Sequence, residues 1–277
     1  MNRDVYGEAL YDYHGLGKLN EPLLLHSSYG DIEEMPIEVF FREEEDIPEL
    51  EFIALSLCDG KVLDVGAGAG VHALYLQEKG FEVDAMEISA TACKIMEKRG
   101  VKNVIHADFF QFAEKKYDTL LFLMNGIGIA ETVDGFRNLL KHSKSLLTDK
   151  GQLIFDSSDI SYLYEEYRIA RPDHYFGEIN FQYEYKGNLG QPFKWLYIDQ
   201  ETLIKIAHEE NWVVQILFED DNDQFLVRME PRRDMSIEII YGDIKDCDTR
   251  YRLLTAKKEK HQKKVPAPKG AGPREID

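Results

Sequence analysis

The stretch "VLDVGAGAG", from Val62 to Gly70, decides the fold of this chain. A short apolar run that contains one aspartate leads into three glycines at alternate positions, Gly66, Gly68 and Gly70. A glycine-rich turn between a strand and a helix lets a ligand approach the backbone closely and points helix N–H groups at it. We therefore expect a binding site at this turn.

The spacing of these glycines narrows the choice of ligand without settling it. The dinucleotide fingerprint is GxGxxG, and here Val71 stands where its third glycine would fall. A Walker loop would end in Gly-Lys followed by Ser or Thr, and this turn does not. A dinucleotide, another nucleotide and a structural turn without a ligand all stay open on the turn alone.

Strand and helix patterns alternate around the turn, which is typical of a parallel sheet with helices on both faces. The patterns predict helices over residues 48–58, 70–80, 90–100, 132–151 and 199–212, of which the fourth is closed by Gly151. They predict strands over residues 61–66, 81–89, 103–108, 117–125, 152–158, 213–220 and 223–231. The fold class is therefore α/β, with a doubly wound, mostly parallel seven-stranded sheet whose last strand is antiparallel.

Composition suggests how the rest of the chain is organised. The start reads as irregular, and an aromatic-rich stretch interrupts the alternation late in the chain. Two alternating runs in that stretch, 178–186 and 193–198, flank the turn-forming "GNLGQP" and predict a β-hairpin. The expected parts are a cap over the active site (1–47), a main domain (48–230) with a substrate-side insertion (159–198), an extension (231–256) and a basic disordered tail (257–277).

Charge and hydropathy limit the partners. The 277 residues carry a formal net charge of −18, although residues 250–277 hold nine lysines and arginines against three acids. The main body should therefore repel nucleic-acid phosphates. Since no apolar run approaches the roughly 20 residues that span a membrane and no signal peptide is evident, we expect a cytoplasmic protein. The scattered Cys58, Cys93 and Cys247 match neither a disulfide framework nor a metal site.

Beyond the turn, the chain resembles the class I S-adenosylmethionine-dependent methyltransferases over roughly residues 49–230. "VLDVGAGAG" looks like their first motif, and Glu87 and then "HADFF" follow at the ends of the next two strands. The resemblance implies a Rossmann-like fold with S-adenosylmethionine as cofactor. It also implies direct in-line transfer of a methyl group. The aromatic-rich and acidic composition favours a small molecule or a peptide or protein side chain as the methyl acceptor.

Candidate cofactor residues follow strand ends in order. Glu87, about 20 residues after the turn, is placed to accept hydrogen bonds from a ribose diol, unless it is a solvated acid, and Ile88 could lie on adenine. The resemblance implies that Asp108 accepts the adenine amino group, that Phe109 flanks the adenine ring and that Asp64 lies near the methionine ammonium. It also implies that Asn125 and Gly126 face the amino-acid end. The full candidate set is Asp64, Gly66, Ala67, Gly68, Gly70, Glu87, Ile88, Asp108, Phe109, Asn125 and Gly126.

The acceptor side is less defined. The segment after Asn125 lacks the (D/N)PP(Y/F) motif of nucleic-acid amino methyltransferases, which disfavours that activity. A general base helps only where the acceptor must lose a proton, and the candidates are His14, Asp156 and Asp159. Candidate substrate contacts, which could equally be packing residues, are Tyr11, Tyr13, His26, Tyr29, Tyr162, Tyr183 and Trp195.

Two other functions compete with methyl transfer. A nicotinamide-dependent oxidoreductase could use a similar fold, but the GxGxG spacing and the lack of a clear hydride-relay set disfavour it. A methyltransferase-like scaffold without catalysis would need no base, and none stands out in this sequence.

Overall fold

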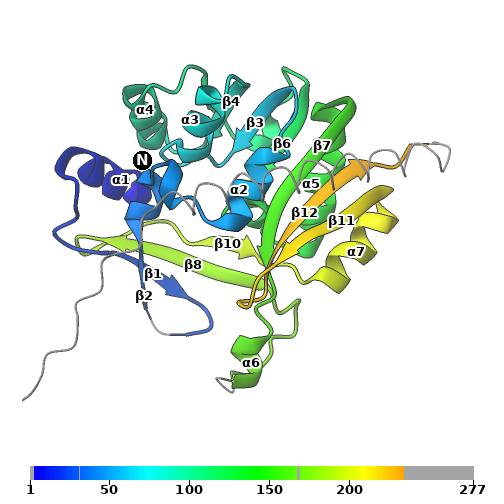
Figure 1. The fold of residues 1–277 in the computed structure, drawn as a ribbon. Helices are drawn as coiled ribbons and strands as arrows, with labels where there is room; N and C mark the ends of the chain where they lie inside the picture. Colours follow the sequence, from blue (N-terminus) through cyan, green and yellow to red (C-terminus); the bar gives the residue numbers. More distant parts are fainter. Residues whose placement is uncertain (1–2, 31, 167–168, 234–277) are drawn as a thin grey trace, which may run out of the picture. The chain divides into compact units, whose positions relative to one another are not determined.

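The computed structural model describes residues 3–30, 32–166 and 169–233 (Figure 1). Within them, a seven-stranded sheet has the order β11-β12-β7-β6-β3-β4-β5. β12 is antiparallel to both neighbours, while β3 to β7 are mutually parallel, which confirms the predicted fold class. The strands are β3 (Lys61–Val65), β4 (Glu82–Glu87), β5 (Val104–His106), β6 (Tyr117–Phe122), β7 (Leu147–Ser158), β11 (Trp212–Glu219) and β12 (Gln224–Pro231).

Helices connect these strands, and α4, α5 and α7 each begin at a capping side chain. Ser89, Thr132 and Asp199 each accept a hydrogen bond from the backbone N–H three residues later, which satisfies an otherwise unpaired donor. α7 lies beside β11 (Figure 1). α4 contacts β5. The helices are α2 (Glu49–Ser56), α3 (Val71–Glu78), α4 (Ala90–Arg99), α5 (Val133–Leu146) and α7 (Gln200–Glu209).

The two faces of β7 have different surroundings. Leu153 and Phe155 are fully buried in the main core with residues of α5 and α7. Ile154 and Asp156 alternate with them and therefore point to the other face, where α2 contacts β7. This alternation places the Asp156 carboxylate inside the protein, beneath the carboxyl end of the sheet.

The junction between α5 and β7 differs from the prediction. The helix ends at Leu146, and Leu147 already pairs with Tyr117, so Gly151 lies inside β7 and closes no helix. The pairing then jumps to Gln152 opposite Thr119. A Cβ at Gly151 would lie 3.0 Å from the Tyr117 carbonyl oxygen, so this glycine permits a close approach of two strands.

The start of the chain is regular, which corrects the interpretation of residues 1–47 as irregular. A second, antiparallel sheet has the order β10-β8-β1-β2, with β9 paired to β8. The predicted hairpin is present, since Phe193 pairs with Phe181, but its other neighbour comes from the N-terminus. The elements are α1 (Val5–Leu16), β1 (Leu23–Ser27), β2 (Glu33–Met35), η1 (Ile37–Phe41), η2 (Glu44–Asp46), α6 (Tyr162–Glu166), β8 (Glu178–Tyr185), β9 (Asn188–Leu189) and β10 (Phe193–Leu196).

Some predictions fall on other parts of the chain. From residue 234 onward, the predicted extension and basic tail lie outside the described residues, as does Cys247. Cys58 and Cys93 are buried free thiols. No helix in the described ranges combines the length and the apolar character needed to cross a bilayer.

Candidate functional site

The glycine turn after β3 adopts a backbone that favours glycine at three positions. Gly66, Gly68 and Gly70 have φ values of 73°, 55° and 87°. A Cβ at Gly66 would meet no atom within 4 Å, whereas one at Gly70 would lie 2.8 Å from a methyl carbon of Val101. The backbone N–H of Ala67 donates to the carbonyl of the residue before Glu87. The turn is therefore open at its first glycine and tightly packed at its third.

A buried carboxylate stands opposite this turn at the end of β4. Glu87 accepts hydrogen bonds from the backbone N–H groups of Gly68 (3.0 Å), Ile88 (2.8 Å) and Ser89 (2.9 Å). Burial raises the pKa of Glu87, although these hydrogen bonds oppose the rise. Beside it the Ile88 side chain is 70% exposed. A hydrogen-bond acceptor next to an exposed apolar side chain fits a ribose diol that carries a flat base.

The next strand end supplies one polar group and one exposed ring. Asp108 caps a short 3-10 turn, η3 (Phe109–Gln111), by accepting the N–H of Phe110 at 2.9 Å. Phe109 is 4% exposed and lies in the main core, with its ring 5.1 Å from that of Phe122. The structure therefore places Phe109 away from the surface, and Phe110 is the exposed ring beside Asp108.

Charged side chains missing from the sequence prediction lie buried near the turn. The Glu51 carboxylate accepts Nη2 of Arg42 at 2.6 Å and pairs with Nε2 of His72 at 2.7 Å. Burial would raise the pKa of Glu51, but these two partners hold it below its ordinary value. Burial likewise opposes protonation of His72, yet the hydrogen bond to Glu51 raises the pKa of His72 above its ordinary value.

Three buried polar atoms around this cluster have no hydrogen-bond partner among the described residues: Arg42 Nε, Asp64 Oδ2 and Asp156 Oδ1. Both aspartates interact electrostatically with Glu51 and His72, so all five groups share one region at the ends of β3 and β7. Buried polar atoms without partners are rare in proteins. A guanidinium donor beside a carboxylate acceptor fits a zwitterionic amino-acid group, such as the methionine part of the implied cofactor.

Asn125, directly after β6, is held from three sides. Its N–H donates to Asp156 at 2.8 Å, its carbonyl accepts Nε1 of Trp195 at 3.1 Å, and its side-chain oxygen accepts the Ser158 hydroxyl at 3.1 Å. Met124 and Asn125 both have positive φ, 59° and 55°. Such conformations cost about 1–3 kcal/mol each outside glycine, and the three hydrogen bonds offset that cost. Gly126 follows and begins η4 (Gly126–Ala130).

Helix α1 covers the glycine turn with a side chain that the sequence analysis overlooked. Tyr6 lies 5.5 Å from Phe40 and 5.6 Å from Tyr183, measured between ring centroids. Its hydroxyl would lie only 3.2 Å from a Cβ at Gly68. Burial and the nearby Glu87 raise the pKa of Tyr6 well above its ordinary value. A helical pattern of Val5, Ala9 and Leu10 could have revealed this buried face.

The predicted base and substrate residues at the N-terminus separate into two groups. Tyr11 and His14 are exposed on α1, and Tyr13 packs partly buried against Phe41 at 4.9 Å. His26 pairs with Glu184 at 2.7 Å on the face of the small sheet opposite Leu25. The structure therefore does not bring His14 or His26 together with Asp156.

The other predicted substrate residues divide between two aromatic clusters. Tyr29 and Trp195 pack partly buried in one apolar cluster around Phe181. Tyr162 lies close enough to Tyr29 to raise its pKa, a minor effect beside that of burial. Tyr183 joins the Tyr6 cluster, and burial raises its pKa to about 12. Asp159 caps the start of the insertion by accepting the Ser161 N–H at 2.8 Å.

Replacing Asp156 with asparagine is expected to stabilise the protein above neutral pH. Burial raises the pKa of Asp156 from 3.8 to about 6, so the folded state holds its proton more tightly than the unfolded state. Stability from this group is complete below the unfolded pKa and is lost as the pH rises through about 6. At about 1.4 kcal/mol per pKa unit, the gain of Asp156→Asn is at most about 3 kcal/mol. Urea titrations of wild type and variant at about pH 5 and about pH 8 check this prediction. An equal gain in the free energy of unfolding at both pH values would contradict it.

Known proteins give a consistent assignment. A sequence model described as a methyltransferase domain matches residues 41–215. A solved S-adenosylmethionine-dependent methyltransferase from Bacteroides fragilis, in complex with S-adenosyl-L-homocysteine, is 36% identical, with a TM-score of 0.76. The alignment covers 83% of this chain and 95% of that one.

Two further relatives give narrower information about this chain. The CcbJ methyltransferase from Streptomyces caelestis is 12% identical with a TM-score of 0.56, over 83% of this chain and 98% of that one, and shows the fold alone. A 23S rRNA (uracil(747)-C(5))-methyltransferase from Pyrococcus horikoshii is 36% identical over 75 residues. That match covers 26% of this chain and only 18% of the rRNA enzyme. From the matched domain and the Bacteroides relative, the chain belongs to the class I S-adenosylmethionine-dependent methyltransferases, and S-adenosylmethionine is its cofactor.

Proposed function

We propose that this methyltransferase acts on a small molecule or on a peptide or protein side chain, with the cofactor held at the carboxyl ends of β3 and β4. The buried Glu87 carboxylate beside the exposed Ile88 carries the proposal, because it sits opposite the open Gly66. Glu87 would accept the ribose hydroxyls and Ile88 would cover one face of adenine. Asp108 would accept the adenine amino group.

The buried charges would hold the amino-acid end of the cofactor. Arg42 would donate to its carboxylate through the unpaired Nε, and Asp64 would accept from its ammonium through the unpaired Oδ2. Asn125 and Gly126 border this end from the loop after β6. Glu51 and His72 keep the guanidinium of Arg42 in place through the ion pairs described above.

The residues of this chain orient the acceptor and take up its proton. The cofactor supplies a methyl group that is already activated, so alignment and exclusion of water matter most. Tyr6 and Phe40 exclude water from the glycine turn. Asp156 has a pKa of about 6 and an unpaired oxygen, so near neutral pH it can accept a proton from the acceptor. This role replaces the one considered for the exposed His14.

The acceptor binds on the side of the small sheet. Trp195 lies on β10, which contacts η4 directly, and Tyr29 packs in the same apolar cluster. Tyr183 lies on the neighbouring strand β8, and Tyr162 lies on α6. The acidic surface of the main body disfavours a nucleic-acid acceptor. Aromatic side chains with hydroxyl and carboxylate neighbours suit a small or peptide-like acceptor.

Calorimetry followed by labelling tests the proposal. The protein is expected to bind S-adenosylmethionine and S-adenosylhomocysteine, and not NAD. Cell extract incubated with the protein and methyl-labelled cofactor should then carry label in the small-molecule or peptide and protein fractions. Binding of NAD alone would contradict the cofactor site, and label confined to RNA or DNA would contradict the acceptor class.

A further inference from the structure

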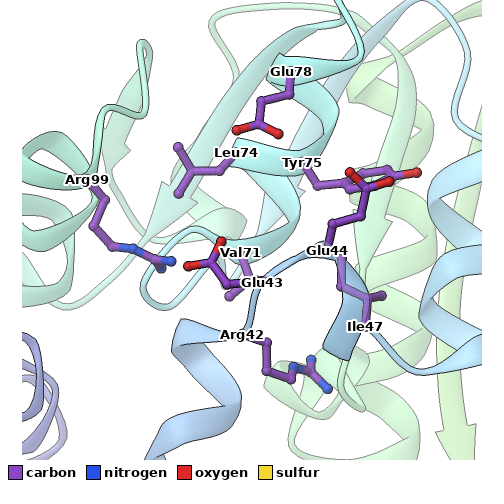
Figure 2. A pocket seen from close by; sticks show the side chains of 9 residues that line it. All are labelled: Arg42, Glu43, Glu44, Ile47, Val71, Leu74, Tyr75, Glu78 and Arg99. Atoms are coloured by element: carbon purple, nitrogen blue, oxygen red, sulfur yellow. The ribbon is translucent and has the colours of Figure 1, made fainter. Parts of the chain in front are cut away.

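Arg99, the last residue of α4, joins three separate elements through one guanidinium. Its Nη1 donates to the carbonyl of Ala69 in the glycine turn at 2.6 Å and to the carbonyl of Phe40 in η1 at 3.1 Å. The guanidinium carbon lies 5.1 Å from the centre of the Phe41 ring. In Figure 2 the guanidinium points from α4 toward the loop that leads into α3.

The guanidinium of Arg99 is partly removed from water, and its contacts must offset that loss of hydration. It borders a small pocket of about 70 Å³ between η2 and α3, which Arg42 and Glu43 also line (Figure 2). Burial lowers the pKa of Arg99, and the negative charge of Glu43 raises it by less, so the pKa lies below its ordinary value. A charge is moved out of water here to bind two main-chain carbonyls. Its contacts therefore fix backbone positions in two elements at once.

The other end of α4 also holds the N-terminal segment. The Ser89 hydroxyl, which caps α4, donates to the Asp4 carboxylate at 2.6 Å, and the same carboxylate accepts the N–H of Gly7 in α1 at 2.8 Å. Ser89 in turn donates its own N–H to Glu87. One helix thus ties the N-terminal segment to the proposed ribose carboxylate at its start and to the glycine turn at its end.

We propose that Arg99 is a positioning residue that couples docking of residues 37–47 to cofactor binding, an inference that rests on the proposed cofactor site. Ala69 lies between Gly68 and Gly70, so the hydrogen bond to its carbonyl sets the orientation of the turn. The Phe40 ring would lie 3.0 Å from a Cβ at Gly68, so its docking closes the same turn. Because coupling between two events is reciprocal, the cofactor must also tighten the docked segment.

Arg99→Met tests the coupling by removing the guanidinium and both of its hydrogen bonds while keeping an unbranched apolar stem. We expect its dissociation constant for S-adenosylhomocysteine to rise about 10- to 100-fold, because two charge-assisted hydrogen bonds to main-chain carbonyls are lost. Arg99→Lys keeps the charge and part of the donor capacity and should restore part of the affinity. The control is Arg137→Met on α5, whose partner is Glu209, and it should bind as the wild type does.

Hydrogen exchange gives a readout that does not depend on activity. S-adenosylhomocysteine should slow amide exchange in residues 37–47 of the wild type, and this protection should be lost in Arg99→Met and partly regained in Arg99→Lys. Affinity of both Arg99 variants within about twofold of the wild type would overturn the inference, as would unchanged protection. If the wild type bound no S-adenosylhomocysteine, the proposed cofactor site itself would be contradicted. If the wild type bound it and the Arg99 variants behaved as the wild type does, only the coupling would be contradicted.

Discussion

Glu87→Ala should weaken binding of S-adenosylhomocysteine by at least about 100-fold and abolish methyl transfer. The carboxylate is expected to accept two ribose hydroxyls, and hydrogen bonds to a charged group contribute about 1.5–3 kcal/mol each. Its removal also leaves the N–H groups of Gly68, Ile88 and Ser89 without their acceptor. Both effects act on the same side of the cofactor. Calorimetry at constant pH and salt measures the loss.

Two comparisons separate the ribose contact from a general defect. Glu82→Ala removes an exposed carboxylate from the other end of β4, where it pairs with Lys61, and should leave binding unchanged. Glu87→Gln retains one acceptor oxygen and should fall between the wild type and Glu87→Ala. Unchanged binding and activity in Glu87→Ala would remove the main support for the cofactor site.

Gly128→Ala should expel the Trp195 indole from its position on η4. A Cβ at Gly128 would lie 1.9 Å from Nε1 and 2.2 Å from Cδ1 of that ring, far inside contact distance. The hydrogen bond from Trp195 to the Asn125 carbonyl is then lost. Because Asn125 is held in a strained conformation beside Asp156, we expect about a 100-fold loss in kcat.

Tryptophan fluorescence reports the expulsion directly. Trp195 and the fully buried Trp212 are the two tryptophans of the chain, so a red shift in Gly128→Ala marks exposure of Trp195. Gly15→Ala is the matched control, since a Cβ there would meet no atom within 4 Å. Wild-type emission together with wild-type kcat in Gly128→Ala would contradict this account.

The main sheet could be predicted because each of its strands and helices has a recognisable local sequence pattern. Apolar runs separated by helical periods mark β3 to β7, and a capping residue, Asp199, marks where α7 begins. The helix end at Leu146 was misjudged because the leucines of "SLLTDKG" continue the helical period into the strand. There the pairing of Leu147 with Tyr117 overrides the local pattern.

The missed parts of the site depend on contacts that no local pattern reveals. Arg42 and Glu51 stand in the acidic run "REEEDIPELE", which looks solvated in sequence. In the structure Glu51 is buried between His72 and the partly buried Arg42. Whether a charge is exposed or buried is decided by the element that packs over it. The strands Glu87 and Asp156 belong to were clear, but the partners of their carboxylates were not.

The pairing of β1 with β8 has a consequence for the order in which this protein folds. Leu24 pairs with Glu184 in that ladder. The ribosome must therefore synthesise all the residues between them, and β8 itself, before β1 can pair with β8. Contacts so distant in sequence form slowly, and nascent chains fold from the N-terminus as they emerge. The glycine turn and its helix can therefore assemble early, while the segment that closes over them waits for residues translated much later.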